Sequence, residues 1–388
     1  MLIGICGAKC AGKSTVARYL IDHHGFKKLR LEPQHPSRAA RGDGNGNGNG
    51  NGGAPDSSSS SSGSHAAAST PDTNGESIKP VRPKQVSSAS SADYTFSTTG
   101  ALLDFVTKHW RARWVTTDIH DEAVLDALSR RPFFILISVD APVTVRWRRY
   151  QERQRSSSSS SPLVDDDVEV DTLEDFVRES DADLYSPAGG GLPLMSRAAI
   201  RLLNTSSSLA HLYASLGKLD LLDADRLRPS WDSYFMSLSS LAAQRSNCMK
   251  RAVGCVLVDA RHRVLSTGYN GTPRSLPNCG EGGCPRCNAG EGSGVSLATC
   301  LCLHAEENAL LEAGRERIRP GSVLYCNTCP CLTCSIKIVQ VGISEVVYNQ
   351  GYSMDGEAAQ VFRTAGIKLR QFSPPPNGLI HLEKMEFY

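Results

Sequence analysis

Two short segments of the chain contain residues that could bind a metal ion and move a proton. His304 precedes Glu306 by two residues, and a Pro-Cys-x-x-Cys segment at 330–334 begins 24 residues after Glu306. His304, Cys331 and Cys334 supply three zinc ligands, whereas a structural zinc normally takes four. The fourth position is then open to a water molecule, which the metal makes acidic enough to ionise near neutral pH. Glu306 is therefore free to move a proton, and the pattern predicts a reaction centre.

Each half of this centre is expected at the start of a helix. Residues 302–313 are rich in Ala, Leu and Glu and predict a helix that has His304 and Glu306 near its beginning. Pro330 suits the first turn of a second helix, over about 331–341, whose dipole would favour thiolates. Two alternatives are a redox cysteine pair or a four-ligand structural site, with His304 a surface histidine. The Glu and the Pro favour the reaction centre, because H-x-E with P-C-x-x-C is the pattern of zinc-dependent base deaminases.

The surrounding sequence alternates strands and helices, which predicts an α/β domain. The first two of five expected strands form an antiparallel pair, and the third and fourth lie between helices, as parallel strands do. A further helix is expected at 355–365. We expect one mixed, mainly parallel sheet with helices on both faces, and its strands at 252–258, 263–269, 322–326, 345–349 and 367–371.

These segments together resemble the deoxycytidylate deaminase family, in particular its fungal form. The resemblance covers residues 228–372, through RPSWDSYFM, RSNCMKRAVGCVLV, GYNGTP, CLCLHAEENALLEAGRERI, CPCLTC and GISEVVYNQGY. It implies a cytidine-deaminase-like fold and the hydrolytic deamination of dCMP to dUMP, which feeds thymidylate synthesis. It also implies that His304, Cys331 and Cys334 hold the zinc. Hydroxide formed on the zinc would attack C4 of cytosine, while Glu306 protonates N3 and then the departing amine.

The resemblance further implies substrate contacts and regulation. Asn270 would bind the sugar, although an Asn-Gly turn without a ligand is an equal alternative. Arg315 and Tyr352 match positions near the nucleotide phosphate, and solvated surface side chains are the alternative for both. The family is activated by dCTP and inhibited by dTTP, with Mg²⁺ accompanying the triphosphates, and its subunits form a homo-hexamer.

Thirteen cysteines also require an explanation. The sequence shows no signal peptide and no apolar run long enough to span a membrane, so we expect a cytoplasmic or nuclear protein without disulfides. A second, structural zinc is our hypothesis, because the CPRC segment at 284–287 has zinc-knuckle spacing. Family members with a second metal use positions matching Cys248, Cys279 and Cys302. Cys287 is the expected fourth ligand, with Cys284 and Cys300 as rivals; free thiols in a loop are the alternative.

The N-terminus carries a separate motif. After a short apolar strand, GAKCAGKS at 7–14 satisfies the phosphate-binding pattern G-x-x-x-x-G-K-S, and a helix follows. Gly7 and Gly12 would let backbone N–H groups face phosphates, while Lys13 reaches the β and γ oxygens and Ser14 reaches Mg²⁺. The region weakly resembles deoxynucleotide or coenzyme A precursor kinases, and Arg146 begins a basic segment suited to a lid. Low complexity occupies the usual acceptor segment, which favours a nucleotide-binding or regulatory domain over a working kinase.

Composition and charge set the outer limits. The 388 residues, 40% of them hydrophobic, can bury two cores. We expect a kinase-like domain at 1–205, a partly helical connection at 206–227 and a deaminase domain at 228–388. Low-complexity segments at 36–93 and 155–170 are expected to be disordered. Because 42 basic residues face 40 acidic ones, no basic field favours nucleic acid, and a free nucleotide is the expected substrate. The rivals are a tRNA or polynucleotide base deaminase and a catalytically silent, zinc-stabilised nucleotide sensor.

Overall fold

The chain forms two compact units in the computed structural model, Met1–Ala198 and Ala199–Tyr388, and each is described by itself. The structure describes residues 1–32, 84–85, 94–158, 171–187, 189–292, 295–351, 355–375 and 378–382. Most of the two expected low-complexity segments lies outside these residues. Among the described residues, no helix combines the length and the apolar composition needed to cross a bilayer. The boundaries expected at 205 and 228 stay predictions.

The N-terminal unit contains a parallel sheet with one antiparallel edge. Its strands follow the order β6-β1-β5-β2-β4-β3, and only β3 runs antiparallel to its neighbour. The central strand, β1 (Leu2–Gly7), is buried almost throughout, as expected for a parallel sheet covered on both faces. The strands are β1 (Leu2–Gly7), β2 (Lys27–Leu31), β3 (Lys84–Gln85), β4 (Tyr94–Phe96), β5 (Trp114–Thr116) and β6 (Phe134–Asp140). The helices are α1 (Lys13–His24), α2 (Thr99–Lys108), α3 (Glu122–Ser129), α4 (Val143–Ser158), α5 (Leu173–Tyr185) and α6 (Gly191–Ser196).

The C-terminal unit contains a five-stranded mixed sheet in the order β12-β11-β10-β8-β9. Its strands are β8 (Gly254–Val258), β9 (Val264–Tyr269), β10 (Val323–Thr328), β11 (Glu345–Gln350) and β12 (Lys368–Gln371). The expectation of a mixed, mainly parallel sheet is confirmed, because four of the five strands run in one direction and β8 alone runs in the other. The strands from β10 to β12 pair in parallel, whereas β8 is antiparallel to both β9 and β10.

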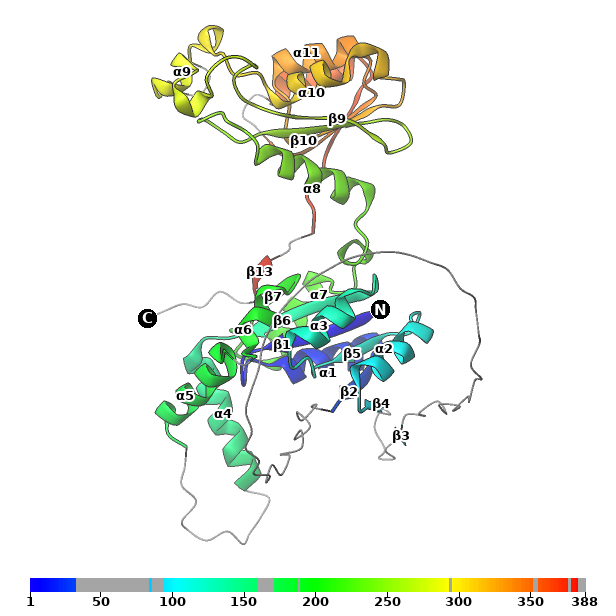
Figure 1. The fold of residues 1–388 in the computed structure, drawn as a ribbon, viewed down its shortest axis with the longest axis vertical. Coiled ribbons are helices and arrows are strands. Elements are labelled where there is room, and N and C mark those ends of the chain that lie inside the picture. The colour runs from blue at the N-terminus through cyan, green and yellow to red at the C-terminus, as the bar shows by residue number, and fades with distance from the viewer. Residues whose placement is uncertain are drawn as a thin grey trace, which may run out of the picture. The chain divides into compact units, whose positions relative to one another are not determined.

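Helices cover both faces of this sheet (Figure 1), and alternating residues of its strands pack against the two helix layers. On one face, Val256, Tyr325 and Val347 pack against Phe235 and Met236 of α8 (Trp231–Ala243). The other face carries Cys255, Leu257, Leu324, Cys326 and Val346 and packs against α10 (Ala305–Ala313), α11 (Leu332–Val341) and α12 (Asp355–Thr364). The expectation of helices on both faces is therefore confirmed, and both helix starts that carry the motif lie on one face.

Polar contacts also attach α8 to its face of the sheet. Arg370 of β12 donates two hydrogen bonds to the carboxylate of Asp232, at 2.6 and 3.0 Å, and a third to Glu345 at 2.9 Å. The Tyr325 hydroxyl donates to the same Asp232 at 2.8 Å. A bidentate Arg–carboxylate pair fixes orientation as well as distance. These bonds therefore link α8 to β10, β11 and β12.

Several shorter elements complete the C-terminal unit. The expected partly helical connection contains α7 (Leu209–Leu219) and a 3₁₀ turn at Ala224–Arg226, so that expectation is confirmed. β7 (Ile200–Leu203) pairs in parallel with β13 (Gly378–His381). Among the described residues between β9 and α10, the elements are α9 (Pro285–Asn288) and two 3₁₀ turns, Cys279–Glu281 and Leu297–Thr299. This last segment has very little regular structure of its own among its described residues.

Candidate active site

The two halves of the motif lie at the N-caps of two neighbouring helices. His304 is the N-cap of α10 and Cys331 is the N-cap of α11. The first helix begins at 305, not at the expected 302, because Leu303 is extended and exchanges two backbone hydrogen bonds with Gly271, at 2.8 and 3.2 Å. Pro330 precedes the cap of α11 and so lies outside its first turn, which corrects the expected position. Glu307 and Lys337 form an ion pair at 2.6 Å that links the two helices.

Glycines in the β8–β9 hairpin let the helices on both faces of the sheet approach it closely. A Cβ at Gly268 of β9 would lie 2.1 Å from the carbonyl oxygen of Ala305, in the first turn of α10. A Cβ at Gly254 of β8 would lie 2.0 Å from the carbonyl oxygen of Ser239, in α8. The Asn308 side chain adds a hydrogen bond of 2.9 Å to the carbonyl oxygen of Tyr269. The turn that carries His304 and Glu306 therefore rests directly on the end of β9.

The three expected ligands converge on one point. Nδ1 of His304 lies 3.4 Å from Sγ of Cys331 and 3.3 Å from Sγ of Cys334, and all three ligand atoms lie within 4.8 Å of one another. Tetrahedral bonds of about 2.0 to 2.3 Å place zinc ligands at such separations. One nitrogen and two sulfur donors also suit zinc. His304 is exposed while Cys334 is buried, so the centre opens to solvent on the histidine side.

Hydrogen bonds within the cluster separate the pKa values of its members. The Cys334 thiol and His304 lower the pKa of Cys331 to about 3, and the same thiol contact, with burial, raises the pKa of Cys334. The hydrogen bond between His304 and Cys331 raises the pKa of His304 to about 9. Without a cation, the site near neutral pH therefore holds one thiolate, one thiol and an imidazolium. Metal binding must remove protons from two of these groups.

Glu306 is buried beside these ligands and is only 4% exposed. Burial raises its pKa to about 7, although His304 and the helix start act in the opposite direction. A carboxylate whose pKa lies near the working pH can both accept and return a proton. The position of Glu306, next to but outside the three ligands, is therefore suited to proton transfer.

The three expected substrate contacts fare differently. The amide of Asn270 accepts from the Val253 N–H at 2.8 Å and from the Ser246 hydroxyl at 2.6 Å, and it donates to the carbonyl oxygen of Arg251 at 2.7 Å. A sugar contact would therefore have to use its second amide hydrogen. Arg315 is exposed in the 3₁₀ turn Arg315–Arg317, at the end of α10 opposite His304, and a helix of this length places it roughly 15 Å away. Tyr352 lies outside the described residues.

The cysteines before α10 also gather. The sulfurs of the four expected ligands of a structural zinc, Cys248, Cys279, Cys287 and Cys302, all lie within 4.8 Å of one another. The two rivals are not excluded, because Cys284, Cys287, Cys300 and Cys302 form a second such set. Arg286, which the sequence analysis did not single out, is 9% exposed and places Nη1 3.9 Å from Sγ of Cys300. Its place between the two cysteines of CPRC was the only signal for it.

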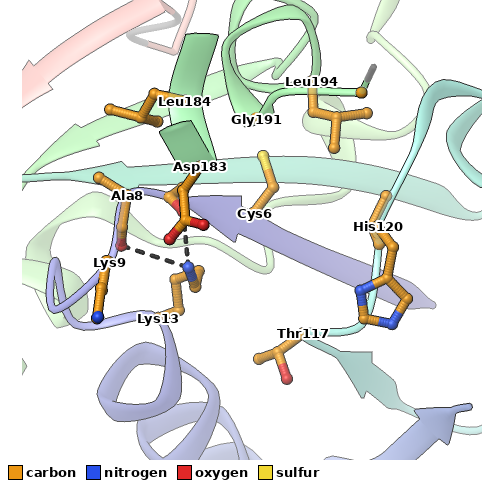
Figure 2. Close-up of a pocket in the computed structure, with 13 residues that line it drawn as sticks. Cys6, Ala8, Lys9, Lys13, Thr117, His120, Asp183, Leu184, Gly191 and Leu194 are labelled. Carbon is orange, nitrogen blue, oxygen red and sulfur yellow. Dashed lines mark hydrogen bonds between the residues drawn. The ribbon is translucent and has the colours of Figure 1, made fainter. Parts of the chain in front are cut away.

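The G-x-x-x-x-G-K-S segment of the N-terminal unit connects β1 to α1, which is the strand, loop and helix order that the sequence predicts. Gly7 and Gly12 have φ of 140° and 110°, and a Cβ at Gly7 would lie 1.9 Å from the carbonyl oxygen of Val139. Lys13 begins α1 and donates to the carbonyl oxygens of Gly7 at 2.6 Å and Ala8 at 3.3 Å. Figure 2 shows its ammonium folded back beside Asp183, in a pocket of about 230 Å³. Burial lowers the pKa of Lys13, and Ser14 next to it is exposed.

The basic segment that was expected to be suited to a lid places its arginines differently. Arg146 is 7% exposed and donates to the carbonyl oxygen of Ala141 and the hydroxyl of Ser180, so it is a structural residue of α4. Arg149, in contrast, reaches the loop and donates to the carbonyl oxygen of Ala11 at 3.1 Å.

Comparison with known proteins places this geometry in a family. The profile of the "Cytidine and deoxycytidylate deaminase zinc-binding region" matches residues 229–350. A Schizosaccharomyces pombe protein named deoxycytidylate deaminase is 41% identical over 377 residues, 97% of this chain and 99% of that protein. The Saccharomyces cerevisiae protein of the same name is 48% identical over 281 residues, 70% of this chain and 85% of that protein.

A solved structure matches part of the chain. The dCMP deaminase of cyanophage S-TIM5, in complex with dCMP and dUMP, is 28% identical and covers 37% of this chain and 98% of its own, with a TM-score of 0.30. The family assignment rests on the identity to the S. pombe protein, which extends over both compact units. With the three converging ligands and the buried Glu306, it shows that this chain belongs to the deoxycytidylate deaminase family.

Proposed function

We propose that the C-terminal unit hydrolyses dCMP to dUMP and ammonia at the centre formed by His304, Cys331, Cys334 and Glu306. The observation that carries this proposal is the buried carboxylate of Glu306 beside three converging ligands that leave one position open. Zinc held by these ligands would make a water molecule in the open position acidic enough to lose a proton near neutral pH. The chain's own residues then have to accept that proton and deliver it to the substrate.

Glu306 is the residue that supplies this proton transfer. As a carboxylate it accepts one proton of the water, and as a carboxylic acid it delivers that proton to N3 of the cytosine. Once the hydroxyl is on C4, the carboxylate takes the remaining hydroxyl proton and delivers it to the departing amine, which leaves as ammonia. The raised pKa that burial gives it keeps both forms accessible near neutral pH. His304, at the exposed side of the centre, leaves the route for the substrate open.

The side-by-side hydrolysis of four substrates tests this proposal. Ammonia release is measured from dCMP, CMP, deoxycytidine and a cytosine-containing oligonucleotide. We expect rapid release from dCMP alone, because a net charge of only +2 gives the chain no basic field to hold a polynucleotide. Activity on the oligonucleotide alone would support the polynucleotide base deaminase. Activity on none of the four, with zinc bound, would support the silent sensor.

The second part of the proposal concerns the N-terminal unit, which we assign to nucleotide binding without phosphoryl transfer. The glycines at 7 and 12, the ammonium of Lys13 and the exposed hydroxyl of Ser14 are arranged as a phosphate cradle with a Mg²⁺ ligand. Binding of ATP, dCTP and dTTP to the full chain, compared with a Lys13→Ala variant, tests this assignment. Transfer of the γ-phosphate to a nucleoside monophosphate would overturn it in favour of a working kinase.

Regulation and assembly complete the proposal. Activation by dCTP, inhibition by dTTP and a hexameric assembly are what the family resemblance implies, and Asn270 remains the proposed sugar contact. A structural zinc held by Cys248, Cys279, Cys287 and Cys302 is supported by the convergence of their sulfurs. The Lys13→Ala variant also locates the regulation. If dCTP and dTTP still change its dCMP kinetics, the effector site lies outside the phosphate-binding loop.

A further inference from the structure

The cysteines between α8 and α10 form a cluster of six, which one zinc ion cannot use in full. The six sulfurs form two sets of four, and both sets contain Cys287 and Cys302. The first set is completed by Cys248 and Cys279, and the second by Cys284 and Cys300. A tetrahedral zinc takes four thiolates. A single ion in the first set would therefore leave Cys284 and Cys300 as two thiols directly beside a charged metal centre.

The arrangement of the six sulfurs is that of two tetrahedra that share an edge. The shared edge is formed by Cys287 and Cys302, whose Sγ atoms lie 4.0 Å apart. Cys284 and Cys300 lie 3.9 Å apart and form the outer edge of one tetrahedron. Cys248 and Cys279 form the outer edge of the other tetrahedron. Their sulfurs lie within 4.8 Å of the shared pair, but they do not belong to the set that contains Cys284 and Cys300. In this geometry each of two ions has two ligands of its own and two bridging ligands.

Hydrogen-bond donors lie beside the sulfurs of both Cys284 and Cys300. The backbone N–H of Leu301 donates to Sγ of Cys284 at 3.4 Å. Six thiolates and two dications leave two negative charges, and the guanidinium of Arg286 beside Cys300 offsets part of them. The second set thus has its own electrostatic support.

Among its described residues, the segment has no buried hydrophobic cluster other than its cysteines. Its hydrophobic cluster consists of cysteines alone, with Cys279, Cys284 and Cys287 buried and the other three packed against them. Its elements are 3₁₀ turns and a four-residue helix, which are too short to be stable by themselves. In small metal-binding segments, the free energy of metal binding supplies the free energy of folding.

We propose that these six cysteines bind two zinc ions as a binuclear thiolate cluster, in which Cys287 and Cys302 bridge the ions and Cys248, Cys279, Cys284 and Cys300 are terminal ligands. This inference extends the proposed structural zinc from one ion to two. It is independent of the catalytic zinc, which uses other residues. Bonds of about 2.3 Å to two shared sulfurs place the ions about 3 Å apart once these sulfurs approach each other to about 3.5 Å, from 4.0 Å in the structure.

The zinc content of the full chain, freed of loosely held metal by a weak chelator, is the first test. Three zinc ions per chain are expected, one catalytic and two in the cluster. Two per chain would overturn the binuclear cluster but leave the single structural zinc, and one per chain would overturn both. None of these counts bears on the catalytic proposal, which the His304→Ala variant addresses separately, since it should lose one zinc whichever count is correct.

Two further measurements identify where the third ion is bound. The double variant C284S/C300S should hold one zinc fewer than the wild type. The matched control C6S/C10S, which removes two cysteines from the other unit, should keep all three. X-ray absorption at the zinc edge should show a zinc–zinc distance of about 3 Å in the wild type. An unchanged count in C284S/C300S, or the lack of any zinc–zinc scattering at full occupancy, would overturn the cluster even if the double variant folded poorly.

Discussion

The catalytic centre and the six-cysteine cluster lie in the same unit and use the same kinds of ligand, but their supports differ. The catalytic ligands are at the N-caps of α10 and α11, and Cys334 belongs to the large hydrophobic core of the sheet. The cluster lies on 3₁₀ turns and a four-residue helix, and its only hydrophobic packing consists of its own cysteines. The fold of the unit therefore positions the catalytic ligands. In the cluster, metal binding would instead stabilise the fold of the segment.

The two sites also differ in their ligand sets, as a catalytic and a structural metal site do. The catalytic set has three ligands, one open position and a buried carboxylate beside it. The cluster consists of sulfur ligands alone, and the charged side chain beside it is the cation Arg286. A closed set of thiolates has no position for a reacting water, whereas an open set requires a neighbouring group to handle the proton. Perturbing one site should therefore leave the other intact.

The largest effect is expected from Glu306→Gln. The amide keeps the size of the side chain but cannot accept the proton, so kcat for dCMP should fall by about 10³- to 10⁴-fold. The zinc content should not change, because Glu306 is not one of the three converging ligands. Glu312→Gln, at an exposed position of the same helix, is the control and should keep its activity. A Glu306→Gln enzyme of near-normal rate would remove Glu306 from the mechanism.

The second prediction concerns the pH dependence of zinc binding at the catalytic centre. The raised pKa values of His304 and Cys334 mean that two protons must leave when the metal binds at neutral pH. The apparent affinity should therefore fall as the pH falls, by about 100-fold per pH unit. Enzyme is equilibrated with chelator-buffered zinc at pH 6.5 and 7.5 and then assayed for dCMP turnover at one common pH, so that only the catalytic zinc is read. Equal midpoints at the two pH values would contradict the assigned protonation states.

A pair of glycine variants tests whether the sheet positions the catalytic centre. Gly268→Ala and Gly254→Ala introduce clashes of similar severity into adjacent strands, one against α10 and the other against α8. Both should lower the free energy of unfolding by about 1 to 3 kcal/mol. Only Gly268→Ala displaces the turn with His304 and Glu306, so it alone should lower kcat/KM for dCMP, by about 10- to 100-fold. Equal losses of activity in both variants would show that stability, and not the position of α10, limits the enzyme.

Much of the catalytic centre could be predicted from the sequence because its parts are local. Residue spacing places His304 and Glu306 on one turn, and the strand and helix patterns around them are strong. The start of α10 was misplaced because the pairing of Leu303 with Gly271 depends on a loop more than thirty residues away. The order of the sheet could not be predicted, because sequence patterns do not show which strand of the hairpin lies next to β10.

The cysteine cluster shows the opposite limit. Its six members were visible in the sequence, but their division into two sets depends on distances across irregular segments that no periodicity encodes. Four were chosen as ligands and two as rivals because a single ion was assumed. Arg286 passed unnoticed, because a surface arginine and a buried one look alike in sequence. The length of α10, which separates Arg315 from His304, also follows only once the helix end is known.

The smallest effect is expected from Arg286→Gln in the cluster. Arg286 donates to the carbonyl oxygens of Val295 at 2.6 Å and Gly292 at 3.2 Å, and it lies beside the Cys300 sulfur. Its loss removes these bonds and a positive charge next to thiolates, so a chromogenic chelator should extract cluster zinc several-fold faster. Arg274→Gln, which changes an arginine exposed to solvent, is the control and should extract like the wild type. Because the catalytic centre has its own support, kcat for dCMP should stay nearly unchanged in both variants, and a parallel loss of activity in Arg286→Gln would show that the two sites are coupled.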